Sequence, residues 1–331
     1  MAIFQKDIFD SLAEDALRKY GMEPDWEATL LQLSENITYL IENRLTGEKA
    51  VLRISRPGYH SMDELEAELL WLKEIKNYTP LIVADPIKGN NGSYIQLINS
   101  WMINNTYACI LYEFLDGRAP DESDEQAILA RFTDLGEATA YLHRHVKMWN
   151  KSDRLNRFVW DYDTMIGNSP RWGRWQQAEE LTGESARMLE RVSSVIKDRL
   201  AQYGKNPKNF GLIHADLRLA NLLIEDDRIK VIDFDDCGFG WFMHDLAASV
   251  SFIETNPLTE RLVWNWLDGY QLVEPLSQRD IDEIDTFIMQ RRLQLLAWLT
   301  SHSDSDPVKE LKIGYTDGTI MLAERFLQKY N

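Results

Sequence analysis

The residue types best suited to catalysis gather in one short stretch in the second half of this 331-residue chain. His214 and Asp216 follow a run of apolar residues, and Asn221 comes five positions after Asp216. Two more apolar runs, separated by an acidic turn, then lead to Asp233. This order of an acid, an amide and a second acid predicts a site where oxygen atoms hold a cation and a carboxylate accepts a proton.

Transfer of a phosphoryl group from a nucleoside triphosphate to an alcohol accounts for these residue types. The acceptor hydroxyl must be oriented and must lose its proton, and a carboxylate on a loop can do both, so Asp216 is the candidate base. Magnesium neutralises the triphosphate and takes hard oxygen ligands. Asn221 and Asp233 are the predicted ligands, and Asp235 is a further candidate, directly or through water. Kinases divide the work in the same way.

Each of these residues also has a purely structural interpretation. A single His-x-Asp is common by chance, and a single Asn is usually a turn residue. The whole order is much rarer, and the two short strands between Asn221 and Asp233 predict a hairpin that brings both ends to one place. His214 is predicted to brace the loop through hydrogen bonds, and Asp236 to be a solvated or loop-stabilising residue.

A nucleotide site of this kind needs a cation on a strand and an acid that holds the cation. The apolar strand at residues 50–54 carries one cation, Arg53. In the helix that follows, Glu68 falls within the apolar stripe and Glu66 falls outside it. A buried carboxylate needs a partner, and a guanidinium suits bidentate pairing. The pattern favours an Arg53–Glu68 ion pair; the alternative is that Glu68 lies at the solvent edge of the stripe.

The turn before the predicted strand at residues 37–43 is the expected phosphate-binding turn. It contains no glycine, so the contacts would come from backbone amides and from polar side chains. These side chains are Ser34, Asn36 and Thr38.

The apolar run at residues 110–115 is predicted to end beside an adenine ring. The ring would bind backbone groups of Glu113, Phe114 and Leu115. An ordinary core strand explains the same run.

The elements that must position these residues form two lobes, so the fold class is α+β. Residues 1–116 are predicted to be a small nucleotide-binding lobe with an antiparallel sheet and one main helix. Residues 117–331 are predicted to be a large, mostly helical lobe that carries the catalytic loop, the metal site and the acceptor site. Strands are predicted at residues 37–43, 49–55, 94–98, 108–114 and within 211–235. Helices are predicted from capping boxes at Ser61 and Ser123, and at residues 176–203, 244–254, 257–271, 277–302 and 307–330.

Composition limits the partners. The chain has 44% hydrophobic and 27% charged residues and no long apolar run, so we expect a cytoplasmic protein with no membrane partner. Its net charge of −17 repels phosphates, so no nucleic-acid partner is expected. This charge suits a cationic substrate, and solubility explains it equally well. Cys109 and Cys237 are expected to be reduced and buried, although their spacing does not exclude a disulfide.

Over nearly the whole chain, these motifs resemble the aminoglycoside phosphotransferase and choline kinase superfamily of small-molecule kinases. The resemblance implies a two-lobed, protein-kinase-like fold with Asp216 as base and Asn221 and Asp233 on the metal. It also implies that Arg53 contacts the triphosphate, and that Asp245 anchors the backbone of the catalytic loop. The matching segments are residues 36–39, 51–54, 68–72, 111–117, 135–143, 213–221 and 232–235.

The chain departs from the usual kinase pattern at several positions. Arg53 replaces the usual lysine, which resembles many homoserine-kinase-like members, and Asp235 replaces the glycine of Asp-Phe-Gly. Ala215 stands where protein kinases carry arginine, and no activation segment ending in Ala-Pro-Glu follows Asp233. This argues against one alternative, a protein Ser/Thr kinase. The intact acids and amide argue against another, a nucleotide-binding pseudoenzyme. The choice of ATP or GTP stays open.

The acceptor is predicted to be a small, amine-bearing alcohol: an amino alcohol, a hydroxy amino acid or an aminoglycoside. Residues 147–175 combine four tryptophans with Asp161 and Asp163, and such a mixture suits an ammonium group. The alternative is that the tryptophans cover the helical core. The four are Trp149, Trp160, Trp172 and Trp175. Further candidates that the sequence does not place are Trp241, Arg291, Arg292 and Trp298.

Overall fold

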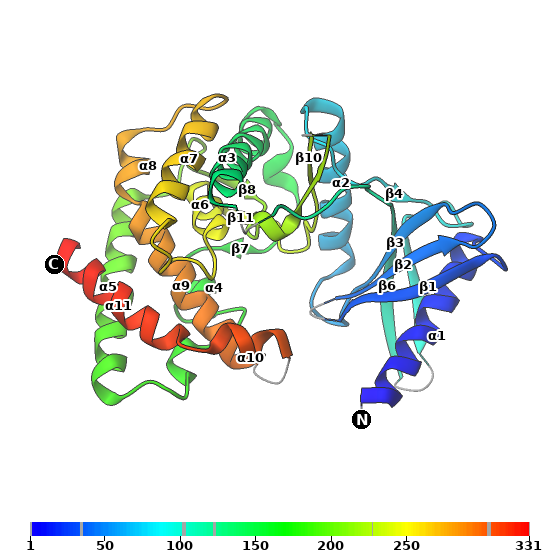
Figure 1. Ribbon diagram of the computed structural model, residues 1–331, viewed down its shortest axis with the longest axis horizontal. Coiled ribbons are helices and arrows are strands. Elements are labelled where there is room, and N and C mark those ends of the chain that lie inside the picture. The colour runs from blue at the N-terminus through cyan, green and yellow to red at the C-terminus, as the bar shows by residue number, and fades with distance from the viewer. Residues whose placement is uncertain are drawn as a thin grey trace. The chain divides into compact units, whose positions relative to one another are not determined.

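The computed structural model describes residues 2–33, 36–100, 104–121, 124–226, 228–302 and 306–330. Two compact units make up the chain. The first unit is Met1–Asn77 with Ile82–Gly117, and the second is Tyr78–Leu81 with Arg118–Asn331. An antiparallel sheet dominates the first unit and helices dominate the second, so the predicted two-lobed α+β fold is confirmed (Figure 1).

The first unit is built on an antiparallel sheet. Its strands are β1 (Trp26–Leu33), β2 (Ile37–Asn43), β3 (Lys49–Ile54), β4 (Pro86–Ile87), β5 (Ile95–Ser100) and β6 (Asn105–Glu113). They follow the order β1-β2-β3-β6-β4, and β5 also pairs with β6. Alternate residues at the start of β2 are buried, as in a strand with one face on a core. The four strands predicted for this lobe agree with β2, β3, β5 and β6.

Besides the predicted main helix, the described part of the first unit contains a second helix that was not predicted from the sequence. α2 (Met62–Tyr78) is the predicted helix, and α1 (Ala2–Tyr20) is an additional one. Ile8, Leu12 and Ala16 of α1 are buried in the same core as the strands of the sheet. Their spacing of four residues is the sequence signal for this helix.

α2 begins with the predicted capping box. The Ser61 hydroxyl accepts a hydrogen bond from the Glu64 N–H at 3.2 Å, and the Glu64 carboxylate accepts one from the Ser61 N–H at 2.7 Å. The buried face of α2 includes Leu65, Leu69 and Glu68. Glu68 is 1% exposed, which excludes the solvent-edge alternative for this residue.

Two small sheets lie in the second unit. The first has the order β7-β11-β8, from β7 (Val159–Trp160), β11 (Gly238–Trp241) and β8 (Phe210–Ile213). The second is the predicted hairpin of β9 (Leu222–Glu225) and β10 (Arg228–Val231), which pair antiparallel.

Helices fill the rest of the second unit. They are α3 (Glu125–Met148), α4 (Tyr162–Met165), α5 (Gly183–Tyr203), α6 (Met243–Ser249), α7 (Thr259–Gln271), α8 (Gln278–Asp282), α9 (Ile284–Ser301), α10 (Asp306–Lys312) and α11 (Tyr315–Tyr330). α9 packs against α5, α6 and α11 (Figure 1). No helix among the described residues is long and apolar enough to cross a lipid bilayer. Cys109 and Cys237 are both buried and unbridged, as predicted.

Several helix boundaries differ from the predictions. The helix predicted at residues 176–203 begins only at Gly183, after the N-cap residue Thr182. The ranges 277–302 and 307–330 each contain two helices. The second of these breaks at Gly314, whose φ of 67° is left-handed and ends a helix readily.

The start of α3 also differs by one residue. The Asp124 side chain is the N-cap and accepts hydrogen bonds from the N–H groups of Gln126 and Ala127. The predicted cap, Ser123, lies outside the described residues. Asp124 satisfies the first turn in the same way that a serine would.

α3 and α7 pack closely because each presents a glycine at their contact. A Cβ added to Gly136 would lie 1.9 Å from the Trp266 carbonyl oxygen. A Cβ added to Gly269 would lie 1.8 Å from the Thr133 carbonyl oxygen. Both obstacles are helix backbone, which cannot rotate aside as a side chain can.

We expect Gly269→Ala to destabilise the protein by about 3 kcal/mol, at the upper end for overpacking, although alanine favours a helix by about 1 kcal/mol. The midpoint of urea unfolding measures this loss. Gly183→Ala is the matched control, because only the Arg187 side chain lies near the added Cβ, at 3.8 Å. A Gly269→Ala protein as stable as this control would contradict the close helix contact.

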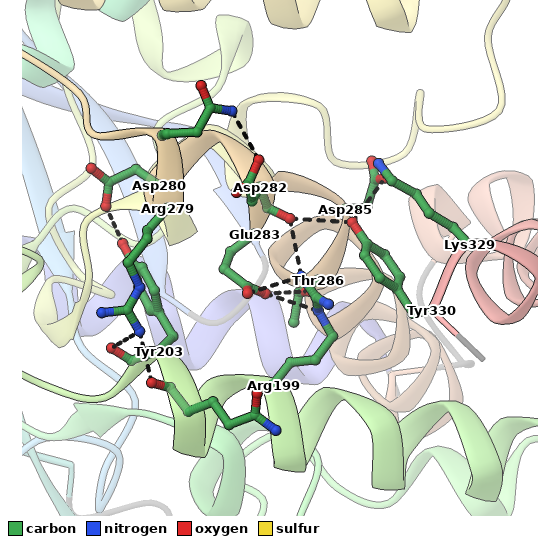
Figure 2. Close-up of polar contacts among 12 residues, drawn as sticks. Arg199, Tyr203, Arg279, Asp280, Asp282, Glu283, Asp285, Thr286, Lys329 and Tyr330 are labelled. Atoms are coloured by element: carbon green, nitrogen blue, oxygen red, sulfur yellow. Dashed lines mark hydrogen bonds and ion pairs between the residues drawn. The ribbon is translucent and has the colours of Figure 1, made fainter.

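A polar network ties the C-terminal helix to α5 and α9 (Figure 2). Arg199 donates from Nε to Glu283 at 3.0 Å and to the Thr286 hydroxyl at 2.8 Å. Its guanidinium lies 3.7 Å from the centroid of the Tyr330 ring. Lys329 pairs with Asp285 at 2.6 Å. These contacts hold α11 against the helix that carries Arg291, a residue of the candidate site.

Candidate active site

The catalytic loop leaves β8 at His214 and is held by a buried carboxylate of α6. Asp245 accepts hydrogen bonds from the backbone N–H of His214 at 3.1 Å and of Ala215 at 2.7 Å. Ala215 has a φ of 68°, a left-handed conformation that is strained for alanine. His143 of α3 also contacts Asp245 through Nε2 at 3.0 Å. The structure therefore confirms Asp245 as the backbone anchor of the loop.

His214 braces the loop, as predicted. Its Nδ1 accepts from the Asp216 N–H at 3.4 Å, and its Nε2 contacts the Ile232 carbonyl oxygen at 3.1 Å. The Phe234 ring packs on the imidazole at a centroid distance of 4.6 Å. Burial lowers the pKa of His214, so the ring is neutral at pH 7 and Nε2 carries the proton.

The Asp216 carboxylate has partners on both oxygens. Its Oδ1 accepts from Arg291 Nη2 at 2.6 Å. Its Oδ2 accepts from Asn221 Nδ2 at 3.0 Å and from Arg218 Nε at 3.4 Å. Asp216 is half-buried, with 20% of its side chain exposed, so part of the carboxylate remains accessible. Arg218 was not predicted as a site residue, although it lies only two residues after Asp216 in the sequence.

The hairpin brings Asn221 and Asp233 together. β9 begins directly after Asn221, and the Ile232 N–H donates to the Asn221 carbonyl oxygen at 3.0 Å. Asp233, the next residue, is exposed and has a left-handed φ of 64°. Strained backbone of this kind clusters at functional sites. Asp235 is buried at 4% exposure, and its carbonyl oxygen accepts a hydrogen bond from Arg157.

The donor set fits a magnesium ion bound with a nucleotide. Asn221 Nδ2 donates to Asp216, so the amide oxygen of Asn221 is the atom left to face a cation. An amide oxygen and the Asp233 carboxylate are hard donors that magnesium accepts, with phosphate and water completing the shell. Among the described residues, no three His, Cys, Asp or Glu side chains gather as a metal cage. A site with few protein ligands is the usual form for nucleotide-bound magnesium.

In the first unit, Arg53 and Glu68 form the predicted ion pair. The two terminal guanidinium nitrogens of Arg53 each lie 2.8 Å from a Glu68 carboxylate oxygen, which is bidentate geometry. The Tyr112 hydroxyl adds a bond to Glu68 at 3.2 Å. Arg53 is 8% exposed, so the cation is fixed in one position on β3.

The other residues of the first unit that were predicted to bind the nucleotide differ in their burial and in their hydrogen-bond partners. Thr38 pairs with Arg53 across β2 and β3, and Asn36 is buried just before β2. Ser34 lies outside the described residues. The Glu113 N–H donates to the Asp85 carbonyl oxygen at 2.9 Å, so this amide already has an acceptor. The half-buried Phe114 and Leu115 follow the end of β6.

The tryptophans of residues 147–175 have different surroundings. Trp160 and Trp175 are 1% exposed and belong to the core, which supports the structural alternative for these two. Trp149 contacts only His145 among the aromatic rings described. Trp172 is half-buried, and the Arg291 guanidinium lies over its ring at 5.0 Å from the centroid. Arg291 therefore contacts both Trp172 and Asp216.

Of the remaining acceptor-site candidates from the sequence, one contacts Asp216 and others have structural partners. Arg291 contacts Asp216, whereas Arg292 pairs with the buried Glu254 at 2.6 Å. Trp241 is 4% exposed and donates to the Gly204 carbonyl oxygen, so it is a core residue. Asp161 caps α4 and pairs with Lys205 at 2.7 Å, which assigns it a structural role.

Buried histidines around the loop predict a loss of stability in mild acid. Burial, followed by the charge of Arg291, lowers the pKa of His244 from 6.5 to about 3. Below pH 6.5, His244 takes up a proton in the unfolded chain but stays neutral in the folded protein. The free energy of unfolding therefore falls as pH decreases. We expect a loss of about 1 kcal/mol from this group between pH 6.5 and 5.5, measured by urea unfolding. His244→Gln should flatten the slope, and a stability that rises with acidity would contradict the prediction.

The two-lobed α+β fold and the residues of the loop that follows β8 point to one class of enzyme, the phosphotransferases. A family model described as "Phosphotransferase enzyme family" matches residues 28–287. The chain belongs to this family. It is a kinase, a transferase that moves a phosphoryl group to an alcohol.

Three relatives illustrate the range within the family. A microcompartment-associated aminopropanol kinase is 36% identical, with a TM-score of 0.88 over 96% of this chain and 98% of that chain. The amicoumacin kinase of Bacillus subtilis (strain 168) is 23% identical over 92% of this chain and 89% of its own length. An amicoumacin kinase solved with AMP-PNP and Ca2+ is 22% identical, with a TM-score of 0.77 over 97% of this chain and 96% of that chain.

Proposed function

We propose that this kinase transfers the γ-phosphoryl group of a magnesium-bound nucleoside triphosphate to the hydroxyl of a small amino alcohol, with Asp216 as base. The observation that carries the proposal is the arrangement of the loop. Asn221 bonds to Asp216, and the β9–β10 hairpin returns the chain to Asn221 one residue before Asp233. This arrangement supports a single site for the proposed base, Asp216, and the two candidate metal ligands, Asn221 and Asp233.

The reaction follows from these positions. The acceptor oxygen forms a bond to the γ-phosphorus, the bond from that phosphorus to the bridging oxygen breaks, and the nucleoside diphosphate leaves. The acceptor proton passes to the Asp216 carboxylate. Asn221 and Asp233 would hold magnesium, which supplies positive charge against the phosphate oxygens. Asp235 is the additional candidate ligand.

The first unit would contribute the nucleotide contacts. The Glu68 carboxylate holds Arg53 in a fixed direction, so the guanidinium can meet a phosphate without losing further side-chain freedom. Thr38 faces Arg53 in the register of β2 and β3 and would act beside it. Asn36, Ser34 and the backbone of residues 113–115 complete the proposed set for phosphate and base.

An amino alcohol is the acceptor class with the best support. The aminopropanol kinase named above shares 36% of its residues over nearly the full length of both chains. The net charge of −17 suits a cationic substrate. An amine-bearing antibiotic is the second candidate, because the amicoumacin kinase of Bacillus subtilis matches 92% of the chain. A protein substrate has no support from either relative.

Nucleotide consumption across an acceptor panel tests the proposal. ATP and GTP are each supplied with magnesium and with aminopropanol, other amino alcohols, hydroxy amino acids, sugars and aminoglycosides. We expect turnover to be stimulated most by amino alcohols. Stimulation by aminoglycosides alone would show that the acceptor is an aminoglycoside and not an amino alcohol. The absence of stimulation by every hydroxyl compound would contradict the small-molecule assignment.

Asp233→Ala tests the magnesium site separately from the base. Loss of one proposed protein ligand should weaken binding of magnesium with the triphosphate by about 10-fold or more, which is about 1.4 kcal/mol. Titration with a fluorescent, non-hydrolysable ATP analogue measures this change with and without magnesium. Affinity equal to that of the wild type would remove Asp233 from the metal site.

A further inference from the structure

Each of the three guanidinium nitrogens of Arg291 donates a hydrogen bond within the second unit. Nη2 donates to Asp216 Oδ1 at 2.6 Å, and Nε donates to the Ser251 hydroxyl at 3.1 Å. Nη1 donates to Gln294 Oε1 at 3.1 Å, and the Trp172 ring lies against the guanidinium. Arg291 is 1% exposed, so its contacts fix its direction independently of any substrate.

Asp216 has few other restraints. The terminal torsion of an aspartate is broad, so a carboxylate needs neighbours to define its plane. Only Oδ2 is held by the loop itself, by Asn221 at 3.0 Å and by Arg218 at a long 3.4 Å. Arg291 provides the short contact to the other oxygen. A reacting group misplaced by about 1 Å can lose about 10²-fold in rate.

We infer that Arg291 is a positioning residue that fixes the plane of the Asp216 carboxylate through Oδ1, and that Trp172 acts on the reaction by holding Arg291. The inference rests on the proposed function, because it takes Asp216 as the base. Trp172 is itself well fixed. Its carbonyl oxygen accepts from the Ser301 hydroxyl at 2.9 Å, and its ring meets Trp160 edge-on at 5.3 Å.

A charge alone does not reproduce this arrangement. Lysine carries a positive charge but not the planar fork that satisfies three acceptors at once. Arg291→Lys should therefore lower kcat about 10-fold, and Arg291→Gln about 10²-fold. The KM for the nucleotide should stay unchanged, because Arg291 has no predicted contact with it.

Arg292 is the matched control. It is the next residue of α9, is 2% exposed and has its own partners in Glu254, Thr319 and the Tyr315 carbonyl oxygen. Arg292→Lys should lower thermal stability as much as Arg291→Lys but retain the wild-type kcat, at a temperature where both variants are folded. Equal losses of kcat in both variants would reduce Arg291 to a structural residue.

Chemical rescue separates positioning from general damage. Guanidinium chloride at a non-denaturing concentration should restore part of the kcat of Arg291→Ala and leave Arg292→Lys unchanged.

A double-mutant cycle then tests Trp172. Trp172→Leu should lower kcat roughly 5-fold to 10-fold on its own, in the range of a buried cation–π contact, and have no further effect in Arg291→Gln. Additive losses would show that Trp172 acts elsewhere and would overturn its part of the inference.

The wild-type protein in the same assay distinguishes a failure of the positioning role from a failure of the proposed function. Wild-type turnover with a full kcat in Arg291→Gln overturns the inference and leaves the proposed function standing. The absence of wild-type turnover with every acceptor overturns the proposed function, and the positioning role with it.

Discussion

Asp216→Ala is expected to lower kcat by about 10²–10⁴-fold, the range for loss of a general base. Nucleotide binding should be almost unaffected, because magnesium and the triphosphate are assigned to Asn221, Asp233 and Arg53. The measurement is kcat with the best acceptor of the panel, together with the affinity for an ATP analogue. Asp216→Asn should be nearly as slow, since the amide keeps the shape of the carboxylate but cannot accept the proton.

The main complication is Arg291, which loses its carboxylate partner in Asp216→Ala. Breaking a buried ion pair from one side costs stability, so the variant must be shown to be folded at the assay temperature. Asp198→Ala, at an exposed position of α5, is the control for removal of an acid. A folded Asp216→Ala protein with undiminished turnover would end the assignment of Asp216 as the base.

Asp245→Ala is expected to destabilise the protein by about 3–5 kcal/mol, the cost of leaving one side of a buried charged network without its partner. The carboxylate is fully buried and accepts from two backbone N–H groups of the catalytic loop and contacts His143. The released N–H groups have no water to replace it. Urea unfolding at pH 7 measures the loss.

Asp245 also holds Ala215 in its left-handed conformation, so activity should fall even in molecules that remain folded. Asp245→Asn should lose less stability than Asp245→Ala, because the amide oxygen retains one acceptor for the loop. The same urea experiment on Asp198→Ala should show a change within about 0.5 kcal/mol. A loss below about 1 kcal/mol in Asp245→Ala would contradict the anchoring role.

Local patterns in the sequence predicted the contacts between residues close in the chain. The Ser61 capping box joins two residues that are three positions apart, and the β9–β10 hairpin joins adjacent strands. The Arg53–Glu68 pair was predicted because helical periodicity places Glu68 on the buried face of α2, and a buried acid needs a cation. Short separations leave few alternatives, so residue types and spacing are enough to identify the partners.

The same patterns did not indicate features whose packing partners are distant in the sequence. α1 has a readable i, i+4 apolar spacing, but its place in the core depends on strands that follow it. In the sequence, the glycines at residues 136 and 269 only lower the helix propensity of their segments. They are explained only by the approach of α3 and α7, in which each glycine meets the backbone of the other helix.

The sequence by itself therefore determined the reaction class and the two-lobed α+β fold, because the catalytic residues and the elements that carry them are local patterns. Only the tertiary structure decided how Asp216 is held, since Arg291 lies 75 residues away. It also separated Trp172 from the core residues Trp160 and Trp175, which look alike in sequence. The physical reason is that long-range contacts depend on how whole helices pack, and residue spacing along the chain does not encode that packing in a readable form.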